Sequence, residues 1–241
     1  MAISGCATPQ PQYQFDPGTR LGVLLKDEGT RLCHSHTGLT VFGNFTNTDY
    51  EFEFDAHAEM KDAFRRVAAA NQQPLLILDE PDYPSRASSY FDFNGWTGAA
   101  TIKPGMGEKL QTLMDKHRLD VLVLDSGYSR EEYEALPDRG NEPWCNVQLQ
   151  TVVGKHVIVN AKSYFQAIGR QPLAVLGSNA GIGGVLVRDA KPADIKALTD
   201  QELEGFVPAA REGVELSVKD FFFELGLGEA DFVEGQNSFS F

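Results

Sequence analysis

Carboxylates follow three apolar runs of the chain, at the points where buried strands are expected to end. They are Asp27, Glu28, Asp79, Glu80 and Asp125, which follow the runs 21–25, 75–78 and 121–124. If these strands are parallel neighbours, the acids meet at the carboxyl edge of the sheet, the usual ligand site of open α/β folds. Carboxylate oxygens suit Mg²⁺, so Asp27, Asp79, Glu80 and Asp125 are candidate catalytic residues of a metal-dependent hydrolase. The alternative is that they are solvated strand ends, which a net charge of −13 supplies freely.

Three other patterns that could carry chemistry are incomplete. The stretch 75–81 resembles the Walker B strand of ABC-type ATPases, but the G-x-x-x-x-G-K-[ST] loop that binds phosphate is missing. Ser126 follows a strand without the G-x-S-x-G turn of a nucleophile. Cys33, His34 and His36 could begin a metal site, but the other histidines are scattered along the chain. We therefore expect a solvated loop there, and we assign neither a metal nor a cofactor.

The sequence around Cys6 has the pattern at which bacterial lipoproteins are lipidated. An aliphatic residue and two small residues precede the cysteine in Ile3-Ser4-Gly5-Cys6, and a polar, proline-bearing stretch follows it. Cys6 is therefore the predicted lipid attachment site, and Ala7 after it resembles lipoproteins sent to the outer membrane. No charged and apolar signal segment stands between Met1 and Cys6, so an incidental cysteine is the alternative.

Two further cysteines remain once Cys6 is set aside. In an oxidising periplasm Cys33 and Cys145 could form a disulfide. The alternative is that both are buried, reduced thiols, as is usual for cysteine in a cytosolic domain.

The charge balance excludes two classes of partner. The chain has 241 residues, with 21 Lys and Arg against 34 Asp and Glu. A net charge of −13 repels nucleic acid and anionic membrane surfaces. No apolar run approaches the length of roughly 18 to 20 residues that a membrane span requires, so membrane contact is expected through the lipid anchor only.

Hydrophobic patterning predicts strands separated by helices. Strands are expected at 21–25, 39–42, 50–54, 75–78 and 121–124. Helices are expected from the N-cap Asp55 through Ala70, and at about 108–117 and 209–225. The alternating run 147–153 and the run 157–165 predict a hairpin about Gly154 and Lys155. The glycine-rich segment 177–184 separates two short apolar runs, and Thr199 begins a capping-box pattern.

These elements predict an α/β fold. We expect a single-domain sandwich with a mixed, partly parallel sheet and an antiparallel hairpin. Residues 1–18 are the expected tether, 19–228 the α/β domain, and 229–241 a C-terminal tail.

A long aromatic segment interrupts this pattern between residues 80 and 106. Loops of that length are usually binding loops or interaction arms. We predict a contact with an envelope protein partner, and the alternative is a cover over one sheet face. The aromatic residues are Tyr83, Tyr90, Phe91, Phe93 and Trp96.

Together with the start at Cys6, the order of elements resembles bacterial envelope lipoproteins with a TolB-N-terminal-like or curli-secretion-lipoprotein-like α/β domain. The resemblance covers the pattern of elements over about residues 20–225. The extra strands between 39 and 54 and the aromatic segment depart from it. It implies a tethered domain on the periplasmic face of the bacterial outer membrane that binds or assembles and does not catalyse.

Three functional hypotheses follow. The first is a lipid-anchored periplasmic protein with a binding or envelope-assembly role. The second is the metal-dependent hydrolase described above. The third is a soluble cytosolic structural protein, which requires Met1 to be the true start and all three thiols to be free.

Overall fold

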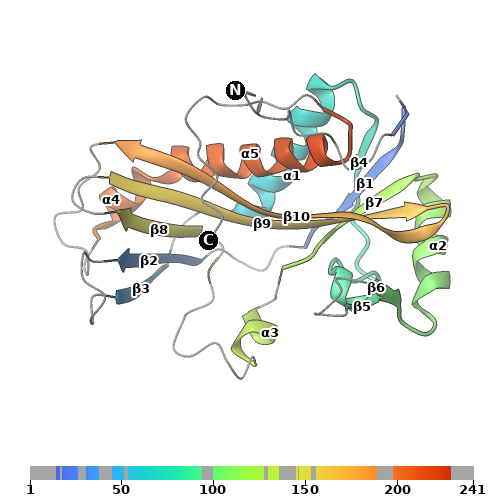
Figure 1. Cartoon of the computed structure of the whole chain (residues 1–241), viewed down its shortest axis with the longest axis horizontal. Coiled ribbons are helices and arrows are strands. Elements are labelled where there is room, and N and C mark those ends of the chain that lie inside the picture. The colour runs from blue at the N-terminus through green and yellow to red at the C-terminus, as the bar shows by residue number, and fades with distance from the viewer. Residues whose placement is uncertain are drawn as a thin grey trace, which may run out of the picture.

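A long antiparallel ribbon of two strands, β9 (His156–Arg170) and β10 (Leu173–Arg188), runs along the sheet. Figure 1 shows other strands gathered toward both ends of this ribbon in the computed structural model. The structure describes residues 15–16, 18–26, 31–37, 45–51, 54–93, 100–127, 130–135, 145, 147–152, 156–188 and 198–228.

One edge of β9 is shared by two strands placed end to end. β7 (Val121–Asp125) is antiparallel to residues 165–169 of β9, and β8 (Val147–Val152) is antiparallel to residues 156–161. Both strands run in the same direction. The chain therefore leaves β9 after β7 and returns to the same edge at β8.

The next line of the sheet is interrupted in the same way. β1 (Leu21–Leu24) is parallel to β7, and β2 (Arg31–Thr37) is parallel to β8. We call the level at which both lines are interrupted, opposite residues 162–164 of β9, the strand break. β9 and β10 continue through it.

Two outer strands complete the sheet. β4 (Leu75–Ile77) is parallel to β1, and β3 (Phe45–Glu51) is antiparallel to β2. The order is β3-β2-β8-β9-β7-β1-β4, with β10 on the other edge of β9. The protein thus has a mixed, partly parallel sheet with an antiparallel hairpin, as the sequence predicts.

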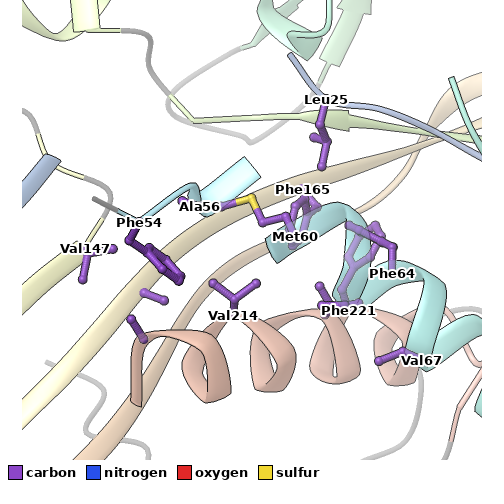
Figure 2. Packing of buried hydrophobic residues seen from close by; sticks show 14 of the residues in the cluster. Leu25, Phe54, Ala56, Met60, Phe64, Val67, Val147, Phe165, Val214 and Phe221 are labelled. Atoms are coloured by element: carbon purple, nitrogen blue, oxygen red, sulfur yellow. The ribbon is translucent and has the colours of Figure 1, made fainter. Parts of the chain in front are cut away.

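Helices α1 (Ala56–Ala70) and α5 (Val207–Glu224) cover one face of the sheet. Asp55 caps α1, because its side chain accepts a hydrogen bond of 2.8 Å from the backbone N–H of Ala58. Phe64 of α1 and Phe221 of α5 both contact Phe165 of β9, with ring centroids 4.9 and 5.5 Å away (Figure 2). This core includes residues from both sides of the strand break, so it joins the two ends of the sheet.

The opposite face is covered near β7 by α2 (Met106–His117) and by the aromatic segment. That segment contains a short 3₁₀ helix (Ala87–Ser89) and a small antiparallel pair, β5 (Phe91–Phe93) with β6 (Ala100–Ile102). Helix α3 (Arg130–Glu134) follows β7. Helix α4 (Asp200–Glu204) precedes α5 and begins with the capping box predicted at Thr199.

Two predictions of local structure are wrong. The segment around Cys33, expected as a solvated loop, is strand β2, and Cys33 is buried because it lies between β3 and β8. The glycine-rich segment 177–184 does not separate two runs but continues β10, because its backbone pairs with β9 throughout. The strand expected at 39–42 lies outside the described residues.

Candidate functional site

The carboxyl ends of β4, β1 and β7 lie side by side, because these three strands are parallel neighbours. This arrangement was the condition for the predicted cluster of carboxylates. Asp27 and Glu28 lie outside the described residues, and Asp79 is exposed. The remaining candidates, Glu80 and Asp125, are each held by their own cation.

Asp125 ends β7 and contacts a buried arginine. One oxygen of its carboxylate accepts a hydrogen bond of 2.7 Å from the backbone N–H of Gly127, and the other lies 3.6 Å from Arg86 Nη2. Arg86 is only 8% exposed, and its Nε lies 3.9 Å from Glu132 of α3. Its Nη1 donates to the carbonyl of Gly127. Arg86 therefore ties β7, the following turn and α3 together.

The backbone beside Arg86 fills part of the strand break. The N–H of Asp125 donates to the carbonyl of Ser85 at 2.9 Å, and Arg86 forms a parallel bridge with Asp125. β1 has already ended at this level, so the segment 85–86 takes the place that β1 leaves beside β7. No signal in the local pattern marks this role, except that Arg86 is the single basic residue between Glu80 and Ile102.

Glu80 follows β4 and bonds to the end of α2. Its Oε1 lies 2.7 Å from Lys116 Nζ and 2.6 Å from His117 Nε2, with the side chain 13% exposed. The hydrogen bond from Lys116, together with that of His117, holds the pKa of Glu80 below its usual range. The same hydrogen bond raises the pKa of Lys116. Glu80 thus acts as a tie between β4 and α2.

Among the described residues, no three histidine, cysteine or acidic side chains are grouped closely enough to hold a metal ion. The hydrolase hypothesis therefore gains no support from this part of the chain. Its remaining acids, Asp27 and Glu28, belong to the segment that the structure leaves undescribed.

The aromatic segment packs largely against its own domain. Tyr90 and Phe91 are buried in the apolar cluster between α2 and the sheet, and Tyr83 is partly buried against this cluster. Lys109 Nζ lies 5.3 Å from the centre of the Tyr83 ring. The hydroxyl of Tyr90 donates to the carbonyl of Pro84 at 2.9 Å, and burial raises its pKa. Phe93 is 42% exposed, and Trp96 lies outside the described residues. Much of this segment is therefore a cover over one sheet face.

The structure holds Cys33 and Cys145 as buried thiols, so it does not contain the expected disulfide. The register places Cys33 opposite Gln148, which is three residues after Cys145. Cys6 lies outside the described residues.

The second edge of β10 presents a different kind of site. β10 is 16 residues long and bonds to β9 along one edge, and no described strand pairs with the other. From Leu173 to Val187 the strand has no charged residue, no histidine and no proline. An unpaired strand edge carries backbone donors and acceptors that can bind another strand.

The other edges of the main sheet differ from this one. β4 has three residues, and β3 has seven, among them Asp49 and Glu51. Short length and charge are the usual protection of an edge against pairing with other chains. Along the described part of the main sheet, β10 is the edge that combines length with an uncharged sequence. We therefore take it as the candidate binding site.

Compared with family models, with curated proteins and with solved structures, the chain shows no significant match. Within the described ranges, no helix has the length and apolar character needed to cross a membrane.

Proposed function

We propose that this protein is a non-catalytic binding and assembly domain that takes up a partner strand along the free edge of β10. The observation that supports this proposal is the long, uncharged edge from Leu173 to Val187. Added strands bind through main-chain hydrogen bonds, so such a site needs no catalytic side chains.

The chemistry of the candidate acids is consistent with this role. Glu80 bonds to Lys116 and His117, and Asp125 contacts Arg86, so these groups stabilise the ends of the parallel strands.

Natural proteins protect long edges with charges, proline or bulges. The register of β10 shifts once, between Val175 and Gly177, and the strand beyond that point is uninterrupted.

For its location, we propose the periplasmic face of the bacterial outer membrane, with the lipid on Cys6. The support is the sequence Ile3-Ser4-Gly5-Cys6-Ala7 and the polar stretch after it. The exposed ring of Phe93 offers a second contact for an envelope partner, as part of the aromatic segment.

The anchor is tested by expressing the native gene, with its own upstream sequence, in a bacterium supplied with a labelled fatty acid. We expect label on the protein and its recovery in the outer-membrane fraction. Cys6→Ser should remove the label and release the protein into the periplasmic fraction, whereas Cys33→Ser should keep the label. A wild-type protein without label would contradict the anchor.

The edge is tested with two neighbouring proline substitutions, Ser178→Pro and Asn179→Pro. Successive residues of a strand direct their N–H groups to opposite edges, so one substitution removes a bond to β9 and the other an outward N–H. We expect the variant that loses the bond to β9 to have a lower melting temperature than wild type. The variant that loses the outward N–H should keep the wild-type melting temperature but no longer form the complex with the partner strand. The complex is measured as native mass after extraction in mild detergent.

Hydrogen exchange of the wild-type protein identifies which of the two amides is bonded to β9. If the variant that lacks the outward N–H keeps a complex of wild-type mass, β10 is not the binding edge.

A further inference from the structure

We propose that the strand added to β10 is the β10 strand of a second copy of this chain, antiparallel and centred on Ala180. This proposal rests on the proposed function, because it names the partner of the same edge. The sequence and the symmetry of the strand carry it.

A closed dimer requires that the paired strands be related by a two-fold axis. Hydrogen-bonded and non-hydrogen-bonded pairs alternate along an antiparallel ladder. A two-fold axis can therefore preserve the ladder only if one residue lies opposite its own copy. The midpoint of the uncharged stretch from Leu173 to Val187 is Ala180, which makes it the natural centre.

With that centre, apolar residues lie near both ends of the paired strands and the glycine-rich segment lies in the middle. The apolar residues 173–175 of one copy would lie level with the apolar residues 185–187 of the other, beyond the register shift between Val175 and Gly177. Between them, Gly177 would lie opposite Gly183 and Ala180 opposite its own copy, while Ser178 would lie opposite Ile182. Cross-strand pairs of matching character are the unit that stabilises a sheet.

The absence of charge favours a second copy over an unrelated partner. Near the centre of a self-paired strand, any charged residue would lie close to its own copy, and like charges across a ladder are destabilising. An unrelated partner imposes no such condition, because opposite charges on the two chains would then add specificity. β10 has its one charge, Arg188, at its very end.

The same two-fold axis is perpendicular to the joined sheet, so the helix-covered face of each copy lies on the same side of that sheet. α5 packs against both β9 and β10, so the α5 helices of the two copies would both lie on one face of the joined sheet. Because the register of β10 shifts between Val175 and Gly177, the regular part of the joined ladder would run from Gly177 to Gly183, roughly 23 Å at the usual rise of a strand.

The test places a photoreactive aromatic residue, benzoylphenylalanine, at position 180 of the full chain in cells that carry it in their envelope. A crosslinked product of twice the chain's mass of 26.5 kDa is the expected result. A product of another mass overturns self-pairing but leaves strand addition at β10 standing. If no crosslinked product forms, both self-pairing and strand addition at β10 are overturned. Benzoylphenylalanine in place of Phe93 is the control, and it should give no product of twice the chain's mass.

The register is tested on purified protein in a Cys6→Ser background, where Cys33 and Cys145 are the remaining cysteines and are buried. Ala180→Cys should form a disulfide-linked dimer on mild oxidation. Ser178→Cys should not, because two copies of residue 178 would lie about 13 Å apart along the ladder, beyond disulfide reach.

Light scattering should show a dimer for wild-type protein and a monomer for the proline variant that lacks the outward N–H. A wild-type monomer at high protein concentration, or equal crosslinking of the two cysteine variants, would overturn the proposal.

Discussion

At the scale of single residues, two of the acids that the sequence marks for chemistry, Glu80 and Asp125, lie in ion pairs with other elements. Glu80 bonds to Lys116 and His117 of α2, and Asp125 contacts Arg86 and the backbone of Gly127. Each ion pair joins the end of a parallel strand to another element. Their removal should therefore lower stability.

Glu80→Gln should lower stability at neutral pH and have less effect in acid. Because the pKa of Glu80 is lowered by folding, its contribution is present above the unfolded pKa and is lost as pH falls through the folded pKa. Urea midpoints of wild type and variant should differ at pH 7 and converge in acid, below the folded-state pKa of Glu80.

The matched control is Asp79→Asn, at the exposed acid next to it. Its midpoint should stay near that of wild type at both values of pH. A difference for Glu80→Gln that persists unchanged in acid would show that charge on Glu80 is not the cause.

The positions of these acids were predictable from sequence, and their partners were not. Apolar runs place Glu80 and Asp125 at strand ends, which the structure confirms. Lys116 and Arg86 reach them only through the packing of α2 and of the aromatic segment on the sheet. No local pattern encodes such long-range contacts.

At the scale of elements, the sequence predicts those with a clear period and caps. The helix after Asp55, the strands at β1, β4 and β7, and the β8–β9 pairing are all confirmed. The sequence pattern predicts two short apolar runs in place of β10, because the glycines between them weaken a strand pattern locally. In the structure β10 is one continuous strand because it pairs with β9 along its length, and this pairing cannot be read from the local sequence pattern.

The close contact between β9 and β10 predicts a specific effect at Gly169. A Cβ there would lie 2.8 Å from Leu176 Cδ1, at a buried position. Gly169→Ala should therefore destabilise the protein by about 1 to 3 kcal/mol, as overpacking does. Urea unfolding measures the change.

Gly107→Ala is the control, since it lies in α2 and its nearest contact would be 3.6 Å away. Gly107 lies in the first turn of α2, where alanine gains less over glycine than in a helix interior, so this variant should have a stability close to that of wild type. A destabilisation of equal size in both variants would show that loss of glycine, and not the contact with Leu176, is responsible.

At the scale of the whole molecule, the net charge of −13 opposes association of two copies, although their proposed contact is uncharged. Salt should therefore strengthen the dimer. Raising ionic strength from about 0.01 M to about 0.1 M shortens the Debye length from about 30 to about 10 Å. Sedimentation should show a several-fold lower dissociation constant at the higher salt. Weaker association would instead indicate ion pairs across the interface.

The strand break also has a consequence for synthesis of the chain. β7 and β8 both need β9, which lies after them in sequence, as the neighbour that aligns them. β1 and β2 pair with those two strands in turn. On the ribosome, the two ends of the sheet therefore cannot be joined until residues 156–170 have emerged. Until then the growing chain holds two separate sets of strands, whose exposed edges are a risk for aggregation.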